Sequence, residues 1–317
     1  MIRTRVLLAD GHVQVGDGLA LARSAPVGAT VWVDVIASNA EDLSSLPGEW
    51  RFHHLALEDC VHEQRRSKYE RFPAHAFVVV HALNTTTDDD LDTLALRIFI
   101  RPGLVVSVHE RPISAVDRVE TLLREDTERI GQSADRVLYA LIDSVVDEFM
   151  PLLDRWESQL DALETRADEH RDLSVMDEVV ALRRNLLVLR RLMLPQQEVV
   201  KRVMDSPETT EAGKIYFRDV LDHMDALADS AQLLVEVCHG MIQVQVERVN
   251  ERLNKTMKYM AIVSTLLLPM TVISGVFGMN FDVIPNQHSA LGFYSAIAMM
   301  VVSALALMIW FRFRKWV

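Results

Sequence analysis

Small and uncharged polar side chains recur every three or four residues toward the C-terminal end of the chain. A heptad count that starts at Asn254 places one helical face at Met257, Ala261, Ser264, Leu268, Thr271, Gly275 and Gly278. A coiled-coil seam favours bulky leucine or isoleucine at such positions. Amide, hydroxyl and small side chains suit either close packing of neighbouring helices or the lining of a water-filled passage.

This face lies in a stretch that carries no charge. No Asp, Glu, Lys or Arg occurs between Lys258 and Asp282, or between Asp282 and Arg312, and each gap is long enough to cross a bilayer once as a helix. A cation that crossed here would meet no counter-charge, so it must keep most of its water or pass between hydroxyl and carbonyl oxygens. Mg²⁺ sheds water reluctantly, so an uncharged polar lumen suits the hydrated ion, and Leu268 suits a constriction that gates by dewetting.

The basic residues that flank the two spans predict the topology. Lys255 and Lys258 precede the first span, and Arg312 and Arg314 follow the second. Positive residues collect on the cytosolic side, so we expect both termini in the cytosol and the protein in an inner or plasma membrane. The first nine residues contain no apolar run typical of a signal peptide. We therefore expect spans at 257–279 and 291–311, an external loop at 280–290 and a basic cytosolic tail at 312–317.

The residues before the spans predict an α+β cytosolic part. Short runs rich in Val, Ile and Phe between residues 28 and 110 are typical of strands, so 1–112 is predicted to be an α/β domain. Residues 57–72 have the pattern of a helix and a turn. Apolar residues three and four apart predict a helical domain at 113–212, in which Pro151 and Pro195 bend or break helices.

A stalk helix at 213–256 is predicted to continue into the first span. No proline occurs between Gly213 and Pro269, and a helix from Gly213 to Met279 would extend about 100 Å at roughly 1.5 Å per residue. A globular domain needs no helix of this length. A stalk that connects a cytosolic domain to a membrane pore does.

The composition excludes several classes of function. The chain has 317 residues and a net charge of −12, whereas binding to nucleic-acid phosphates requires a basic face. Its two cysteines, Cys60 and Cys238, form neither a CxxC pair nor a disulfide framework. The sequence contains no P-loop, GxSxG or HExxH motif, so we expect neither an enzyme nor an ATP-driven pump.

The end of the first span carries a recognisable signature. The run from Asn254 ends in Phe277-Gly278-Met279-Asn280, with a proline in mid-helix, and Tyr216-Phe217-Arg218-Asp219-Val220 lies upstream. This arrangement resembles the CorA family of divalent metal cation transporters, the two-span GxN superfamily, which includes a zinc-transporting ZntB-like branch. The clear resemblance covers about the last hundred residues.

The resemblance implies a funnel-shaped homopentamer in the lipid bilayer. Five first spans would line the pore, and Gly278, Met279 and Asn280 would form the selectivity filter, in which Asn280 binds a hydrated cation through its waters. The pore-lining positions would be Asn254, Met257, Ala261, Ser264, Leu268, Thr271 and Gly275. A divalent cation, Mg²⁺ or Zn²⁺, would be both substrate and regulator, and no catalytic cofactor is implied.

The resemblance also implies a regulatory metal site on the cytosolic side. Asp219 resembles one acidic position of the family's stalk, and Asp222 follows it by one helical turn. We expect the partner of Asp219 to lie in the run Asp88-Asp89-Asp90 of a neighbouring copy, where Asp89 and Asp90 are the candidates. A divalent ion that bridges such carboxylates would hold the channel closed. The alternative for the aspartate run is a solvated loop.

The external loop departs from the pattern of magnesium channels in the family. Asn286 stands where those channels usually have a glutamate, and Asp282 and His288 are ligands that suit a softer ion such as Zn²⁺ or are simply exposed loop residues. The leading hypothesis is a channel for Mg²⁺, Co²⁺ or Ni²⁺. The alternatives are a Zn²⁺ transporter, with or without proton coupling, and a membrane-anchored metal sensor that conducts nothing.

Overall fold

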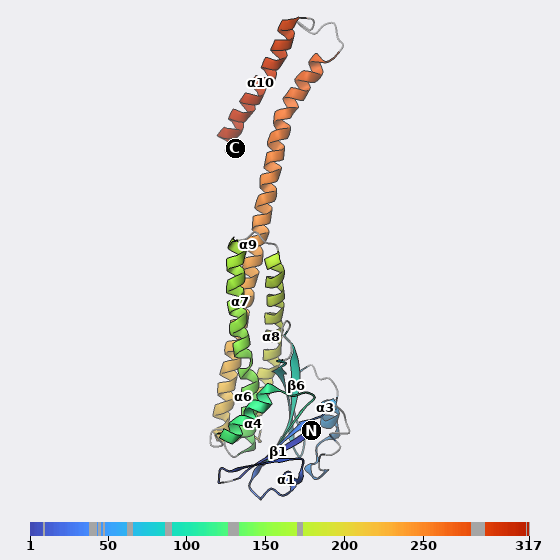
Figure 1. Ribbon diagram of the computed structural model, residues 1–317, viewed down its shortest axis with the longest axis vertical. Coiled ribbons are helices and arrows are strands. Elements are labelled where there is room, and N and C mark those ends of the chain that lie inside the picture. The colour runs from blue at the N-terminus through green and yellow to red at the C-terminus, as the bar shows by residue number, and fades with distance from the viewer. Residues whose placement is uncertain are drawn as a thin grey trace. The chain divides into compact units, whose positions relative to one another are not determined.

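The computed structural model describes residues 1–8, 10–37, 43, 46, 48–61, 66–85, 91–125, 133–169, 174–279, 289–314 and 316 (Figure 1). Contacts divide the chain into two compact units, Met1–Gly240 and Met241–Val317. The first unit holds a mixed sheet and most of the helices. The second holds the rest of the longest helix and one further apolar helix, so the described architecture is α+β, as expected.

The first unit is built on a seven-stranded sheet within the described residues, in the order β2-β1-β3-β7-β6-β5-β4. The strands are β1 (Ile2–Leu7), β2 (Val13–Asp17), β3 (Thr30–Ile36), β4 (Lys68–Arg71), β5 (Ala76–Leu83), β6 (Thr93–Arg101) and β7 (Leu104–His109). Among the described strands, β3 and β7 are the one pair that is parallel. Gly103 turns the chain between β6 and β7 at a φ of 74°, a conformation that favours glycine.

Three strands lie outside what the sequence predicted. β1 and β2 precede residue 28, and β4 falls within 57–72, where the prediction was a helix and a turn. The helix of that segment is α3 (His54–Val61). The strand Lys68-Tyr69-Glu70-Arg71 contains no β-branched residue, and it forms because it pairs with the apolar edge of β5. Pairing across the sheet therefore outweighs local propensity here.

Two helices of the first unit contain Pro151 and Pro195, the prolines expected to bend or break helices. Besides α3 and the first part of the longest helix, the described helices of this unit are α1 (Ala20–Arg23), α4 (Ser114–Glu125), α6 (Ala134–Asp147), α7 (Phe149–Glu169) and α8 (Ser174–Met204), with a short 3-10 turn at Gly48–Trp50. The predicted break near Pro151 is present, since α6 ends just before α7 begins. Pro195 lies inside α8 on its exposed side, where the carbonyl that a proline leaves unpaired is open to solvent.

The long helix is continuous. α9 runs from Glu211 to Phe277, close to the predicted 213–279, and contains Pro269 without ending there. α10 (Ala290–Phe313) begins at Ser289, whose hydroxyl accepts a hydrogen bond from the Gly292 N–H at 3.2 Å. By length and composition, α9 and α10 are the two described helices apolar enough to cross a membrane.

A buried carboxylate anchors the start of α9. Asp135, near the start of α6, accepts hydrogen bonds from the backbone N–H (2.9 Å) and hydroxyl (2.7 Å) of Thr210. The Thr210 hydroxyl in turn accepts from the Gly213 N–H at 3.0 Å. Burial raises the pKa of Asp135, but hydrogen bonds from Ser133 and Thr210 outweigh burial and hold the pKa below its usual range. The ionised carboxylate therefore caps the positive end of α9.

Replacing Gly213 by alanine is expected to lower the thermal stability of the full-length protein. A Cβ at this position would contact Asp135 Oδ2 and come within 3.2 Å of the Thr210 hydroxyl, which forces the capping group to move. The expected cost is about 1–3 kcal/mol. Gly240→Ala is the matched control in the same helix, because nothing lies within 4 Å of its added methyl. The free energy of unfolding of this control should rise by up to about 1 kcal/mol, because alanine has a higher helix propensity than glycine. Equal melting temperatures for both variants would contradict the capping role.

A polar network crosses the middle of the sheet. The Ser107 hydroxyl donates to Asp34 at 2.5 Å and accepts from the Trp32 indole N–H at 3.0 Å. His109 contacts Asp34 through Nε2 (3.0 Å) and the Arg111 carbonyl through Nδ1 (2.5 Å). Both partners of His109 are acceptors, so both ring nitrogens must donate. His109 is therefore an imidazolium paired with a buried carboxylate.

This pair predicts a pH-dependent contribution to stability. Burial lowers the pKa of His109, but the hydrogen bond and charge of Asp34 outweigh burial and raise the pKa above 6.5. The stabilisation is complete below about pH 6.5 and is lost as the pH rises through the folded-state pKa. The difference in melting temperature between wild type and His109→Gln should therefore shrink from pH 6 to pH 8. His12→Gln, at an exposed position, is the control. A difference that stays constant with pH would exclude the charged pair.

Candidate functional site

The predicted pore-lining residues lie on one exposed side of α9. Asn254, Ala261, Ser264, Thr271 and Gly275 are exposed, and Met257 and Leu268 are 60% and 68% exposed. The shielded side of the same stretch runs instead through Ile262, Leu266, Met270 and Ile273. The predicted face is thus free within a single chain. It is available to a lumen or to another copy, and it is not packed against α10.

The helix ends where the predicted filter begins. Gly278 donates its N–H to the carbonyls of Ser274 (3.0 Å) and Gly275 (3.2 Å), and Met279 donates to Val276 at 3.3 Å. A Cβ on Gly278 would lie 3.0 Å from the Ser274 carbonyl, so this turn is tight enough to favour glycine. Asn280, the third residue of the predicted filter, and the loop residues Asp282 and His288 lie outside the described residues.

The Thr271 hydroxyl on this face is held close to the helix. Thr271 donates its hydroxyl proton to the Leu267 carbonyl at 2.9 Å. Its oxygen lone pairs remain directed away from that bond, so the side chain presents an acceptor. An acceptor without charge interacts with the water shell of a cation and does not trap the bare ion.

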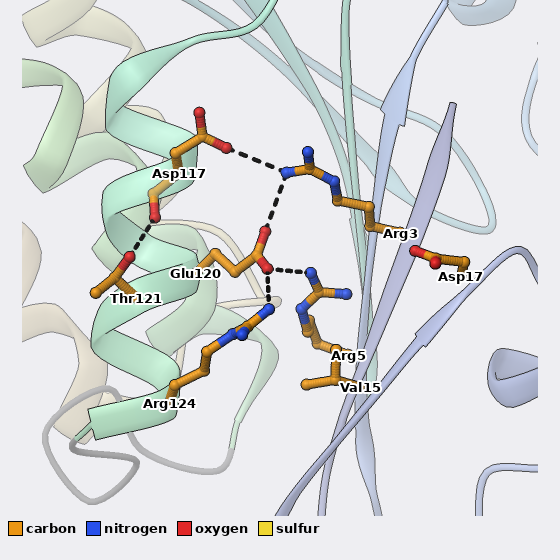
Figure 2. Close-up of a pocket in the computed structure, with 8 residues that line it drawn as sticks. All are labelled: Arg3, Arg5, Val15, Asp17, Asp117, Glu120, Thr121 and Arg124. Atoms are coloured by element: carbon orange, nitrogen blue, oxygen red, sulfur yellow. Dashed lines mark hydrogen bonds and ion pairs between the residues drawn. The ribbon is translucent and has the colours of Figure 1, made fainter.

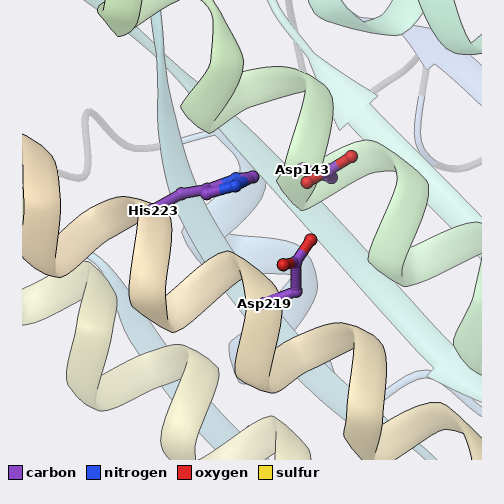
Figure 3. A group of neighbouring side chains, drawn as sticks. All are labelled: Asp143, Asp219 and His223. Atoms are coloured by element: carbon purple, nitrogen blue, oxygen red, sulfur yellow. The ribbon is translucent and has the colours of Figure 1, made fainter.

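In the first unit, three side chains converge between α6 and α9 (Figure 3). The ligand atoms of Asp143, Asp219 and His223 all lie within 4.8 Å of one another. Asp143 comes from α6, and Asp219 and His223 are one turn apart on α9. Asp219 is exposed, and the other two are partly buried. Two carboxylates and an imidazole are a ligand set for a divalent cation.

Aromatic packing holds this group together. Tyr139 lies one turn before Asp143 on α6, and its ring centroid is 5.2 Å from that of Tyr216 and 6.2 Å from that of Phe217, both on α9. The Tyr139 hydroxyl also hydrogen-bonds to Asp143. The contacts fix α6 against α9 one turn from the ligand atoms, so the group is held by packing as well as by its own charges.

The group has an excess of negative charge. Burial, and next to it the charge of Asp147, raises the pKa of Asp143 to about 6. A raised carboxyl pKa means that the folded protein disfavours the charged form. His223 Nδ1 is buried and has no hydrogen-bond partner among the described residues. A divalent cation would relieve the repulsion between the carboxylates.

The structure thus selects among the acidic residues that the sequence suggested. Asp219 is in the group, whereas Asp222 is exposed and is not part of it. Asp89 and Asp90 lie outside the described residues. Sequence reasoning missed Asp143 and did not assign a role to His223. A signal existed for Asp143, since Asp135, Tyr139, Asp143 and Asp147 recur at four-residue spacing along this helix.

The fold and these two sites define the class of the molecule. A mixed α/β unit with an acidic ligand group is joined by one continuous helix to an apolar unit that contains two candidate membrane spans. This is the organisation of a membrane protein that handles cations. The chain matches the model of the CorA-like Mg²⁺ transporter protein family over residues 28–315 and belongs to that family. Members of the family are ion transporters or channels and not enzymes.

Relatives align along nearly all of the chain. It is 30% identical to the putative metal ion transporter YfjQ of Bacillus subtilis over 90% of this chain and 89% of that protein. It is 29% identical to the cobalt/magnesium transport protein CorA of Thermotoga maritima, over 90% of this chain and 83% of that protein. The zinc transport protein ZntB of Pectobacterium atrosepticum is 23% identical, over 84% of this chain and 83% of that protein.

A solved structure has the same fold. The complete structure of the CorA magnesium transporter from Methanocaldococcus jannaschii matches with a TM-score of 0.85 at 22% identity, and the match covers 100% of this chain and 99% of that one. At this identity the likeness establishes the fold. It confirms the expected order along the chain, which is an N-terminal α/β part, a long helix and a C-terminal apolar helix.

Proposed function

We propose that this chain is a subunit of a homopentameric divalent cation channel in a cell membrane, with α9 lining the passage. The observation that carries the proposal is the exposed, charge-free face of α9 from Asn254 to Gly275. This face remains exposed in a single chain and carries amide and hydroxyl groups. Contact between such polar groups and lipid is unfavourable. Five such faces around a wet lumen remove that cost.

Mg²⁺ is the cargo that best suits this lining. The lumen offers amide and hydroxyl oxygens at Asn254, Ser264 and Thr271, and no carboxylate or imidazole. Mg²⁺ keeps several waters and holds them tightly, so it passes as a hydrated ion. Leu268 narrows the passage with an apolar ring that closes by dewetting. Gly278, Met279 and Asn280 form the filter at the external mouth.

The Asp143–Asp219–His223 group is the proposed regulatory metal site. Asp219 and His223 are on α9, the helix that continues without a break to Phe277. A cation bound to the group ties α9 to α6 and favours the closed state. When the cation leaves, the carboxylates repel each other, and the equilibrium shifts towards the open state. A partner carboxylate from the run 88–90 of a neighbouring copy would add to the same site.

A Zn²⁺ transporter is the second candidate, and one specific feature favours it. The imidazole of His223 is a better ligand for Zn²⁺ than for Mg²⁺. The loop residues Asp282 and His288 would supply further ligands of this kind at the external mouth. A chain that binds metal at the group without conducting, as a sensor, is the remaining candidate.

Metal uptake into proteoliposomes separates these candidates. The full-length protein is reconstituted, and uptake of Mg²⁺ and Zn²⁺ is measured singly and in competition, with and without a pH gradient. We expect Mg²⁺ uptake driven by the membrane potential and insensitive to the pH gradient. Zn²⁺ uptake that requires the gradient would favour the second candidate. Uptake no faster than in empty liposomes would exclude conduction.

A further inference from the structure

Three arginines surround a cavity in the first unit (Figure 2). The cavity has a volume of about 620 Å³ and is lined by Arg3, Arg5, Val15, Asp17, Asp117, Glu120, Thr121 and Arg124. It belongs neither to the α9 face nor to the metal-ligand group. Small-molecule sites in proteins are typically between about 300 and 1,000 Å³.

The architecture of the cavity follows from two periodicities. Arg3 and Arg5 alternate on β1, so both point to one face of the sheet, and the register pairs them with Asp17 and Val15 of β2. The α4 residues of the cavity recur at helical spacing, and therefore share the side of α4 that faces this sheet surface. These residues are Asp117, Glu120, Thr121 and Arg124. One wall is thus a strand pair and the other is a helix.

The ion pairs of the cavity engage its three arginines and two of its three carboxylates. Arg3 contacts Asp117 and Glu120, each at 3.2 Å. Glu120 is shared further by Arg5 and by Arg124, the latter at 2.6 Å. Three guanidiniums therefore share two paired carboxylates, and Asp17 is the third carboxylate of the lining. Asp17 is exposed and forms no ion pair with the described residues.

Arg5 supplies the second and independent observation. Its side chain is 4% exposed, and its donors are only partly used: Nη1 donates to the Thr4 carbonyl at 2.9 Å and Nη2 pairs with Glu120. Its Nε is buried and has no hydrogen-bond partner among the described residues. An unsatisfied buried donor on a cation is costly, so a protein retains one where a ligand or ordered water satisfies it.

We propose that this cavity binds the phosphate or diphosphate group of a small cytosolic molecule. A guanidinium presents paired N–H donors that match two phosphate oxygens, and three guanidiniums around one cavity match the several oxygens of a diphosphate. A volume of about 620 Å³ leaves room beyond the phosphate groups for the rest of a small molecule. The assignment is independent of whether the chain conducts ions.

Isothermal titration of the full-length protein in detergent with pyrophosphate, in buffer free of divalent cations, tests the proposal. We expect saturable binding with one site per chain. Arg124→Gln should weaken it about tenfold or more, because a charge-assisted contact is lost. Asp17→Asn should strengthen it several-fold, because a repelling carboxylate is removed. Both positions are exposed, so neither change should disturb folding.

Arg202→Gln is the matched control. Arg202 is 59% exposed and pairs with Glu198 four residues before it at 2.9 Å, just as Arg124 is 57% exposed and pairs with Glu120. It lies on α8 and is not among the residues that line the cavity. We expect this control to bind pyrophosphate like the wild type. The proposal is overturned by an absence of saturable binding, or by equal weakening in Arg124→Gln and Arg202→Gln.

Discussion

Replacing Asn280 by alanine is expected to reduce metal uptake into proteoliposomes by roughly tenfold or more. In the proposed pentamer each copy contributes one carboxamide to the external mouth, so a single substitution removes five hydrogen-bonding groups at once. These groups contact the water shell of the incoming cation, and an alanine ring offers nothing in their place. The measurement is the initial rate of Mg²⁺ uptake at equal amounts of reconstituted protein.

The control for this prediction is Gln287→Ala. Gln287 carries the same carboxamide group in the same loop but lies outside the filter motif. We expect its uptake rate to stay close to that of the wild type. Uptake that survives Asn280→Ala unchanged would remove the carboxamide ring from the mechanism, even if the protein conducts. A similar loss in both variants would point to a general effect of the loop.

Asp143→Asn and Asp219→Asn are each expected to weaken Mg²⁺ binding to the metal-free protein by about tenfold or more. Each substitution removes one anionic ligand from the group of Asp143, Asp219 and His223. Regulation should change in the same direction, so that uptake continues at internal Mg²⁺ concentrations that close the wild-type channel. Titration calorimetry measures the first effect, and uptake into liposomes preloaded with Mg²⁺ measures the second.

Asp222→Asn is the matched control for these variants. It removes the same charge from an exposed position one turn along α9, outside the group. We expect its Mg²⁺ affinity to stay within a few-fold of the wild type. If Asp222→Asn weakened binding as strongly as Asp219→Asn, the effect would come from the general negative potential of the stalk. The specific group would then be excluded.

A stability measurement separates ligand loss from misfolding. Burial and the neighbouring Asp147 raise the pKa of Asp143 to about 6, so its charge is unfavourable in the folded protein at neutral pH. That cost is present above the folded-state pKa and is relieved as the pH falls through it. Asp143→Asn should therefore melt at a higher temperature than the wild type at pH 8 without metal. Added Mg²⁺ should raise the melting temperature of this variant by less than it raises that of the wild type.

Several features of this protein were predictable from the sequence because they depend on local patterns. The gaps in charge between Lys258, Asp282 and Arg312 are enough to predict two membrane spans. The absence of proline between Gly213 and Pro269, together with helical periodicity, predicts one long helix, which the structure has as Glu211–Phe277. The Gly278-Met279-Asn280 motif, at the end of the first of two C-terminal spans and downstream of the Tyr216–Val220 segment, likewise indicates the family.

Other features depend on contacts between segments far apart in the chain. Asp143 lies near Asp219 and His223 because α6 packs against α9, where Tyr139 contacts Tyr216, and neither segment alone encodes that pairing. The strand Lys68–Arg71 lacks the composition of a strand and forms by pairing with β5. The arginine-lined cavity requires β1 and α4 to face each other. Periodicity specifies which face a residue occupies, but only tertiary packing specifies which other face it meets.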